Sequence, residues 1–193
     1  MASKKVLRKV FLEKRLFLSE EEYLHRNTLL QSSIANHIDF KKFQCLHTFL
    51  SIASKKEVLT QPIIGQALAQ NPNISVLVSK TLPGNKLSHY LYNQDTKIVI
   101  NNWGIPEPSE ADPISPAEVD LVLVPLITFD RLGHRIGYGK GYYDRFLKTI
   151  PHARKVGLSL APTLDLIPFS DVMDVRLDSC ITPFKVYEFD TSV

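Results

Sequence analysis

The sequence is poor in cysteine and has no long hydrophobic run. Its two cysteines, Cys45 and Cys180, are far apart and show neither Cys-x-x-Cys nor Cys/His spacing, so we expect no disulfide framework and no zinc site. No apolar stretch approaches the roughly 20 residues that a membrane helix needs. The basic N-terminus is soon followed by Glu13 and lacks an apolar signal core. These absences predict a cytoplasmic protein with reduced thiols and no membrane partner.

Charge of one sign is also scarce. The 193 residues carry a formal net charge of only +3, which does not point to nucleic acid as a partner. Hydrophobic residues make up 44% of the chain, enough for a sizeable core. There is no internal repeat and no low-complexity segment. We expect one domain over residues 1–193, as a monomer or a weak homo-oligomer.

What the chain does contain is a distinctive segment over residues 120–147. It opens with a continuous apolar run, residues 121–127, which is typical of a strand buried on both faces. Glycines then stand at alternate positions, Gly137, Gly139 and Gly141, and aromatic residues recur at helical spacing after the last of them. The segment therefore predicts a buried strand, a glycine-rich turn and a helix.

That order of elements favours a site for a polyanion. The first N–H groups of a helix lack intrahelical partners and carry partial positive charge, and glycines allow close approach of a ligand. Arg135, Lys140 and Arg145 add cations around the turn. No Ser or Thr follows Lys140, so this is no Walker A loop, and the glycine spacing differs from the dinucleotide fingerprint. Nucleotide phosphates are the favoured ligand; a tight glycine turn with solvated cations is the alternative.

Along the rest of the chain, helical and strand patterns alternate. Ser3 is a candidate cap for a first helix, Ser19 and Glu22 form a capping box for a second, and Pro62 suits the first turn of a third. Helices are expected over residues 3–17, 19–36 and 60–70. Strands are expected over residues 46–52, 74–78, 87–92, 97–100, 155–160, 180–182 and 186–189. The alternation predicts an α/β fold with a mainly parallel sheet covered on both faces.

The central residues V-P-L-I-T-F-D-R-L-G-H-R-I-G-Y-G-K-G-Y-Y-D-R-F-L resemble the signature of the 5-formyltetrahydrofolate cyclo-ligase family, also called methenyltetrahydrofolate synthetase. The resemblance implies a compact three-layer α/β/α domain of Rossmann-like character. It also implies that ATP and Mg²⁺ are used to convert 5-formyltetrahydrofolate, with or without a polyglutamate tail, to 5,10-methenyltetrahydrofolate. ATP would phosphorylate the formyl oxygen, and a neighbouring folate nitrogen would then close the ring and expel phosphate.

The resemblance also assigns an ATP site and a metal site. Lys4 and Arg8 share a helix face by spacing alone, for which a solvated basic face is the alternative; the family carries a K-x-x-L-R element here that contacts ATP. Carboxylates suit Mg²⁺ beside phosphate oxygens, and the family positions that serve the metal correspond to Asp144 and Asp174. The residues expected to hold ATP are Lys4, Lys5, Arg8, Arg135, Gly137, Gly139, Lys140, Gly141, Tyr142 and Tyr143.

Substrate contacts are likewise implied by the resemblance. The family has a folate-binding glutamate in E-x-x-T, matched here at Glu57, and an aliphatic residue at the end of the preceding strand, Ile52. An aromatic residue in a proline-rich loop lines the folate pocket, and that position is Trp103. Tyr138 and Tyr142 are expected to shape the junction between ATP and folate. One departure is the loop expected at residues 79–81, where Ser-Lys-Thr replaces the proline and basic residue common in the family.

The expected chemistry requires positioning and charge neutralisation rather than a nucleophilic side chain. Lys140, Arg135 and Tyr142 are the residues assigned to catalysis. Two alternatives stay open because a fold does not fix its chemistry. One is phosphoryl transfer to another metabolite; the other is a non-catalytic descendant that binds RNA or protein. The first would not need Glu57 and Trp103, and the second would not need every glycine of the central segment.

Overall fold

The computed structural model describes residues 3–109, 112–169 and 173–190. Its centre is a seven-stranded sheet in the order β11-β10-β9-β6-β1-β2-β3. The inner strands are parallel to one another, and the edge strands β3 and β11 are antiparallel to their neighbours. The strands are β1 (Cys45–His47), β2 (Ser75–Leu82), β3 (Lys86–Leu91), β6 (Leu121–Pro125), β9 (Arg154–Leu158), β10 (Ser179–Ile181) and β11 (Val186–Glu188).

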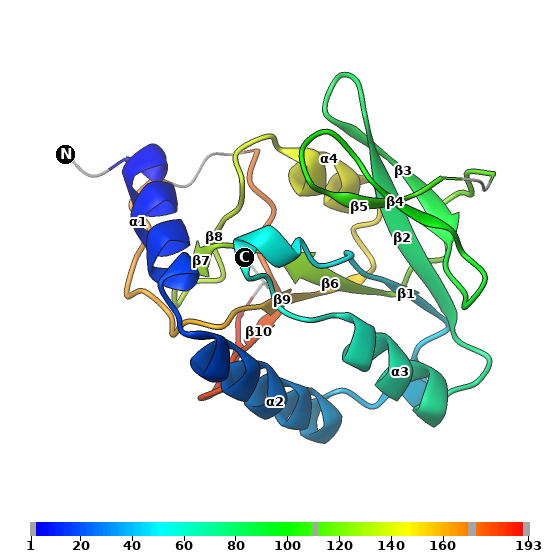
Figure 1. Cartoon of the computed structure of the whole chain (residues 1–193), viewed down its shortest axis with the longest axis horizontal. Coiled ribbons are helices and arrows are strands. Elements are labelled where there is room, and N and C mark those ends of the chain that lie inside the picture. The colour runs from blue at the N-terminus through cyan, green and yellow to red at the C-terminus, as the bar shows by residue number, and fades with distance from the viewer. Residues whose placement is uncertain (1–2, 110–111, 170–172, 191–193) are drawn as a thin grey trace.

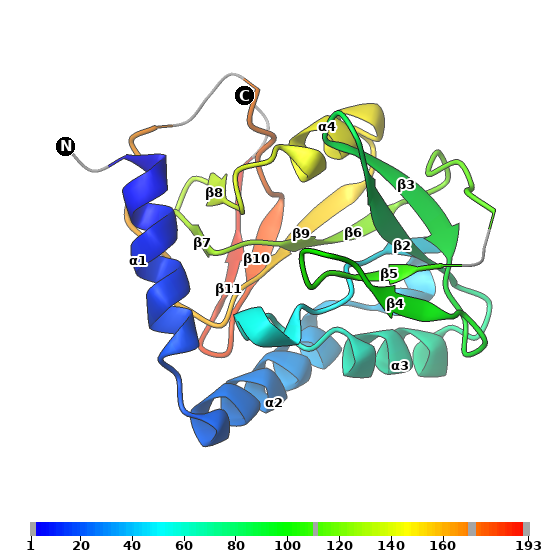
Figure 2. The same ribbon diagram turned by 45° about the horizontal axis from the view of Figure 1, so that its top comes forward.

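Helices cover both faces of this sheet. α2 (Glu20–His37) and α3 (Gln61–Gln70) lie on one face, and α4 (Tyr142–Thr149) lies on the other (Figure 1). α1 (Lys4–Leu16) stands across the end of the sheet from which the glycine-rich turn emerges (Figure 2). The expected three-layer α/β/α fold with a mainly parallel sheet is confirmed.

The central strand β6 shows why a continuous apolar run was needed. Leu121 and Leu123 pack into the core that α2 and α3 cover, and Val122 and Val124 pack into the core under α4. All four are fully buried. Successive strand residues point to opposite faces, so a strand with helices on both sides must be apolar at every position.

The helix boundaries follow the expected capping residues closely. The Ser3 Oγ accepts a hydrogen bond from the Val6 N–H at 3.3 Å, and the Ser19 Oγ accepts one from the Glu22 N–H at 3.1 Å. Pro62 occupies the first turn of α3, where a missing N–H has no cost. Within the described ranges, no helix is long and apolar enough to cross a membrane.

The strand expected over residues 46–52 is wrong beyond His47. Two hydroxyl groups draw the chain into a turn there, because the Ser51 Oγ bonds to the Val58 carbonyl at 2.6 Å and the Thr60 Oγ1 bonds to the Phe49 carbonyl at 2.7 Å. Such side-chain bonds to the backbone compete with a strand ladder. The chain therefore leaves the sheet early and forms the loop that carries Glu57.

The loop expected at residues 79–81 is also wrong, because β2 runs through it to Leu82. The Glu107 carboxylate accepts hydrogen bonds from the Thr81 N–H at 2.8 Å and hydroxyl at 2.6 Å, which fixes this end of the strand. Residues 97–100 were expected to form a strand near a sheet edge, and they do form a strand. This strand, β4 (Ile98–Ile100), pairs with β5 (Pro106–Pro108) in a separate two-stranded sheet. A third small sheet joins β7 (Thr128–Phe129) to β8 (Arg135–Ile136).

Two buried histidines lie beneath α4. The rings of His47 and His89 are 5.1 Å apart, and both contact the Phe146 ring, at 4.5 and 4.4 Å. Burial lowers the pKa of His89 to about 4, and burial followed by the neighbouring His89 lowers the pKa of His47 well below its usual range. Both rings are therefore neutral at physiological pH and act as part of the packed surface that supports α4.

The close packing of β9 gives a stability prediction. A Cβ added at Gly157 would lie 2.6 Å from the Leu177 Cδ1 and 2.8 Å from the Leu126 Cδ2, inside the core. We expect Gly157→Ala to lower the free energy of unfolding by about 1–3 kcal/mol through overpacking. Gly65 of α3 has no neighbour within 4 Å of an added Cβ, so Gly65→Ala should instead gain about 0.5–1 kcal/mol. Urea unfolding of both variants measures the change in the free energy of unfolding. An unchanged stability of Gly157→Ala would contradict the packing argument.

Candidate active site

The glycine-rich turn lies between β8 and α4, beyond the carboxyl ends of the parallel strands. Open α/β sheets place their ligands at this edge. Gly139 and Gly141 have φ values of +87° and +69°, which L-residues with a side chain rarely adopt. A Cβ at Gly139 would also lie 2.7 Å from the Arg8 guanidinium. The turn therefore needs glycine both for its backbone conformation and for the close approach of Arg8.

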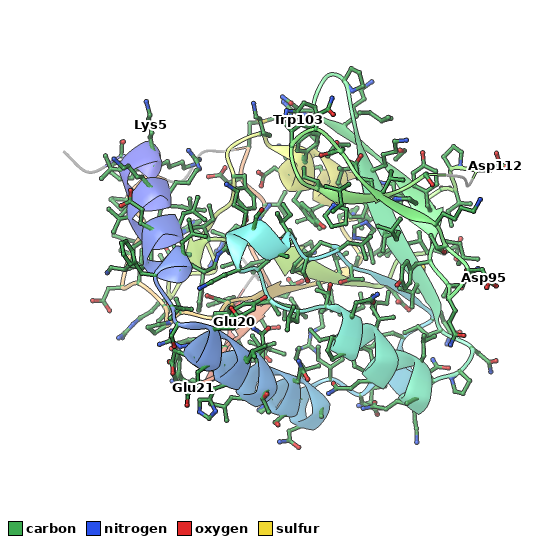
Figure 3. All side chains as sticks on the ribbon, viewed as in Figure 1. Lys5, Glu20, Glu21, Asp95, Trp103 and Asp112 are labelled. Atoms are coloured by element: carbon green, nitrogen blue, oxygen red, sulfur yellow. The ribbon has the colours of Figure 1, made fainter. Side chains whose placement is uncertain are left out.

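α1 brings its basic face onto this turn. The Arg8 Nε donates a hydrogen bond to the Gly137 carbonyl at 2.8 Å, and the Lys4 Nζ forms an ion pair with Asp174. Lys5 is exposed, and its side chain points away from the body of the protein (Figure 3). Of the two N-terminal lysines assigned to ATP, Lys4 is thus the one whose side chain lies in the site.

The two expected metal ligands lie close to each other. The Asp144 Oδ1 accepts hydrogen bonds from the Arg135 Nη2 at 2.7 Å and from the Val175 N–H at 3.1 Å, and Asp174 is the residue before Val175. The described residues contain no group of three or more His, Cys, Asp or Glu side chains that could hold a metal ion. Two carboxylates suit Mg²⁺ if phosphate oxygens and water complete its coordination.

Asp178, four residues after Asp174, has a different position. An extended chain would have directed the two carboxylates to the same side. Instead, the Asp178 Oδ2 accepts a hydrogen bond from the Lys155 N–H at 2.6 Å and lies 3.5 Å from the Lys155 Nζ. Asp178 thus stabilises the start of β9, at the amino ends of the parallel strands and away from the glycine-rich turn.

The remaining residues of the turn differ in exposure. Lys140 is exposed and Tyr142 is half-buried at the start of α4. The Tyr143 ring packs against Phe146, with 6.1 Å between ring centroids, and burial raises the pKa of its hydroxyl. Tyr143 was expected to bind ATP. Its hydroxyl has almost no solvent contact, so only its backbone N–H is available to a phosphate.

Glu57 lies at the other side of the site, buried and held on both oxygens. Its Oε1 accepts a hydrogen bond from the Tyr138 hydroxyl at 2.6 Å, and its Oε2 accepts one from the Ile52 N–H at 2.7 Å. The Tyr23 hydroxyl fixes the Glu57 carbonyl at 2.6 Å. Burial raises the Glu57 pKa above its ordinary value of 4.5, against the opposing effect of these hydrogen bonds. Hydrogen bonds therefore connect three residues that were assigned to the substrate: Ile52, Glu57 and Tyr138.

Arg15 is a site residue that sequence reasoning missed. Its Nη2 donates to the Tyr138 hydroxyl at 2.6 Å and its Nη1 donates to the Leu126 carbonyl at 3.1 Å. Tyr138 thus lies between a guanidinium and the Glu57 carboxylate, and burial, then Glu57, raises its pKa. A signal existed in the sequence, since Arg15 follows Arg8 by seven residues and so shares its helix face.

Trp103 lies on the loop after β4 and is 71% exposed (Figure 3). The Asn101 side chain shapes this loop by accepting hydrogen bonds from the N–H groups of Trp103 at 2.9 Å and Ile105 at 3.1 Å. A Cβ at Gly104 would lie 3.9 Å from the Ser54 Oγ, which places the loop beside the segment after Ile52. The indole is therefore accessible for stacking close to the Ile52–Glu57 segment.

A parallel α/β sheet with basic side chains around a glycine-rich turn at its carboxyl edge is the arrangement of an α/β enzyme that acts on anionic small molecules. The sequence model of the 5-formyltetrahydrofolate cyclo-ligase family matches residues 1–183. The chain belongs to this family and is an enzyme of the ligase class.

Individual relatives agree with this assignment. The probable 5-formyltetrahydrofolate cyclo-ligase of Schizosaccharomyces pombe is 33% identical over 149 residues, which are 68% of this chain and 72% of the relative. The 5-formyltetrahydrofolate cyclo-ligase of Escherichia coli K12 is 29% identical over 137 residues, which are 69% of this chain and 75% of the relative. The structure of Aquifex aeolicus 5,10-methenyltetrahydrofolate synthetase has a TM-score of 0.81 and 32% identity, with coverage of 97% and 93%.

The burial of Glu57 predicts a pH dependence of stability. A carboxyl group whose pKa is raised on folding stabilises the folded state below its ordinary pKa, and this contribution is lost as the pH rises through the raised value. Glu57→Gln keeps the shape and can still accept from the Ile52 N–H. We expect the stability of the wild type relative to Glu57→Gln to fall as the pH rises above the ordinary pKa of 4.5 and through the raised pKa of the folded state. Urea unfolding across this range measures the difference; a rise would mean that Arg15 outweighs burial.

Proposed function

We propose that the chain uses ATP and Mg²⁺ to cyclise 5-formyltetrahydrofolate to 5,10-methenyltetrahydrofolate, releasing ADP and phosphate. The formyl oxygen attacks the γ-phosphorus of ATP and ADP leaves. The neighbouring folate nitrogen then attacks the activated carbon and loses its proton, and phosphate leaves as the ring closes. The observation that carries this proposal is the meeting of the basic glycine-rich turn with the Glu57–Tyr138 pair at one edge of the sheet.

In this proposal the phosphates lie against the glycine-rich turn. Lys4, Arg8 and Lys140 supply positive charge, and the N–H groups at the start of α4 add hydrogen bonds. Arg135, whose side chain is only 5% exposed, pairs with Asp144 in the free protein. Neutralisation of the moving phosphoryl group in a water-poor site is the main catalytic effect expected for this chemistry.

Asp144 and Asp174 would hold Mg²⁺, which would neutralise phosphate oxygens when bound. Two observations support this assignment. Asp144 accepts a hydrogen bond from the N–H of Val175, the residue after Asp174, and both carboxylates already form ion pairs with cations. Arg135 and Lys4 neutralise them in the free protein. Binding of the metal would release both cations toward the phosphates, so charge remains balanced before and after binding.

The folate would lie between Glu57 and Trp103, with Ile52 against its ring. The pyrimidine part of a pterin carries N–H donors, for which a buried carboxylate with free lone pairs is a suitable acceptor. The two Glu57 hydrogen bonds hold the carboxylate in place before the substrate arrives. The exposed indole can stack on the flat heterocycle. Tyr138 and Tyr142 would separate the two ligands near the reacting oxygen.

Some expectations from the sequence stay predictions. They are the cytoplasmic location, the single domain over residues 1–193, the monomeric or weakly oligomeric state, the absence of a nucleic-acid partner and the use of polyglutamylated folate.

The direct test is formation of the methenyl product, whose extended conjugation gives a distinct near-ultraviolet absorbance. Purified protein is mixed with 5-formyltetrahydrofolate and Mg²⁺, with and without ATP. We expect the absorbance to rise only when ATP is present. If ATP binds and no product forms, the phosphoryl acceptor is another metabolite; if ATP does not bind either, the proposed function is wrong.

Removal of a charge from the turn tests the assigned roles. We expect Lys140→Ala and Asp144→Ala each to lower kcat by about 10²–10³-fold, because each removes a group that stabilises the charge of the transferred phosphoryl group. Lys148→Ala is the control, since Lys148 is an exposed lysine in the last turn of α4, the helix that carries Asp144. Circular dichroism verifies that each variant is folded. Near-normal turnover in Lys140→Ala or Asp144→Ala would refute the role given to that residue.

A further inference from the structure

The Tyr138 hydroxyl lies between two groups that fix the direction of its proton. The Arg15 Nη2 donates a hydrogen bond to the hydroxyl at 2.6 Å, and the hydroxyl donates one to the Glu57 Oε1 at 2.6 Å. Burial, then the charge of Glu57, raises the Tyr138 pKa, so the hydroxyl keeps its proton at physiological pH. A guanidinium has only donors, so the tyrosine oxygen accepts from Arg15 and its single proton must point to Glu57. We call this directed set of hydrogen bonds the Arg15 network.

The direction of the Arg15 network determines which form of Glu57 fits it. The Glu57 Oε1 faces the Tyr138 hydroxyl proton, and its Oε2 faces the Ile52 N–H at 2.7 Å. A protonated carboxyl group would place its own proton against one of these two donors, whichever oxygen carried it. The two contacts therefore favour the ionised carboxylate and oppose the effect of burial, which leaves Glu57 only 3% exposed.

The guanidinium of Arg15 is fixed from two sides. Arg15 belongs to the last turn of α1, and its Nη1 donates to the carbonyl of Leu126, the residue after β6, at 3.1 Å. Its guanidinium carbon lies 5.9 Å from the centre of the Tyr138 ring. The positive charge of Arg15 is thus held beside Tyr138, one side chain away from Glu57.

Burial and the surrounding charges act on Glu57 in opposite directions. Burial raises the Glu57 pKa, and the hydrogen bonds from Tyr138 and the Ile52 N–H lower it. The charges of Arg15 and Lys55 lower it as well, but Arg15 also acts through its hydrogen bond to Tyr138. The titratable and charged groups that face Glu57 are Arg15 of α1, Tyr23 of α2, Tyr138 of the glycine-rich turn, Tyr143 of α4 and Lys55 of its own loop.

We propose that Arg15 is a positioning residue of the reaction, which acts through Tyr138 to favour the ionised, hydrogen-bond-accepting form of Glu57 that the folate substrate needs. This inference rests on the proposed function, in which the Glu57 carboxylate accepts from N–H donors of the pterin. A protonated Glu57 would present a donor to a donor and weaken substrate binding. Arg15 itself contacts neither ligand and acts only through the Arg15 network.

The first test measures the ionisation of Glu57 directly, by NMR of protein with isotope-labelled glutamate carboxyl carbons. Glu57→Gln assigns the signal. We expect Glu57 to titrate about 1 pH unit higher in Arg15→Gln than in the wild type, because a nearby cation and the directed proton are lost. Arg15→Lys keeps a cation that has only donors, so its titration should lie nearer to that of the wild type. Equal titrations in Arg15→Gln and the wild type would overturn the inference.

The pH dependence of kcat/KM tests the consequence for the substrate. Activity should fall on the acidic side as Glu57 takes up a proton, and the fall should begin about 1 pH unit higher in Arg15→Gln. The phosphates of ATP also titrate, so the compared quantity is the difference between variant and wild type, in which ATP cancels. A purely structural defect would instead lower activity equally at every pH, and that result would refute the inference.

A double-mutant cycle tests whether Arg15 acts through Tyr138. On the acidic side of the profile, Arg15→Gln should raise the KM for 5-formyltetrahydrofolate by about 10-fold and change kcat less, since a pKa higher by 1 unit lowers the ionised fraction tenfold. In a Tyr138→Phe background the network is already broken, so the same substitution should change KM by less than about 3-fold. Effects that multiply independently would contradict the proposed route.

Lys9→Gln is the matched control, because Lys9 is an exposed cation of the same helix, with 77% of its side chain accessible, and its ion-pair partner is Glu13. Its Glu57 titration and its KM should equal those of the wild type. A shift as large as that of Arg15→Gln would assign the effect to the general charge of α1 and overturn the inference. If the wild type forms no methenyl product, the proposed function is wrong and the inference falls with it; every other outcome leaves the wild type active.

Discussion

The attachment of α1 depends on the active site itself. No residue of this helix is fully buried, so it lacks the apolar anchor that holds α2, α3 and α4 to the sheet. Its specific contacts are made by cations: Lys4 to Asp174, Arg8 to the Gly137 carbonyl, and Arg15 to Tyr138 and the Leu126 carbonyl. The free energy that positions α1 and the geometry of the proposed phosphate site are therefore two aspects of the same contacts.

This arrangement follows from the topology. Parallel strands bring their carboxyl ends to one edge, and the loops that leave β1, β6 and β9 carry Glu57, the glycine-rich turn and residues 159–162. A helix placed across that edge lies beside these loops (Figure 2). Its basic face then meets the Asp174 carboxylate and the carbonyl groups of Gly137 and Leu126. The fold thus concentrates polar groups where the strands end and leaves both sheet faces apolar.

Much of this was predictable from the sequence, for identifiable reasons. The run Leu121–Val124 is apolar at every position, which only a strand covered on both faces requires, and Ser3 and Ser19 mark helix starts through local bonds. The errors arose where contacts outside the local pattern decide the outcome. β2 continues to Leu82 because Thr81 and Leu82 pair with β3, and the Glu107 carboxylate, 26 positions from Thr81, bonds to this end of the strand.

The candidate site shows the same division. The glycine-rich turn was visible because its glycines, cations and aromatic residues are neighbours in sequence, and the family resemblance supplied Glu57, Trp103 and the aspartates. Arg15 was missed because its role depends on contact with Tyr138, 123 positions away. Tyr143 was assigned from its place in the motif, whereas its side chain faces the core. Motif position fixes the backbone course of the turn but does not fix which side chains point outward.

In the free protein, the carboxylates of the site are neutralised by cations of the same site, and this affects how ATP and Mg²⁺ would bind. Asp144 pairs with Arg135 and Asp174 pairs with Lys4. Under the proposed function, a divalent cation alone must break these pairs and leave two cations uncompensated, whereas a phosphate chain alone meets the two carboxylates. When both arrive together, the carboxylates face the metal and the cations face the phosphates. The ion pairs of the free protein therefore favour joint binding of nucleotide and metal, since either ligand alone would leave like charges in contact.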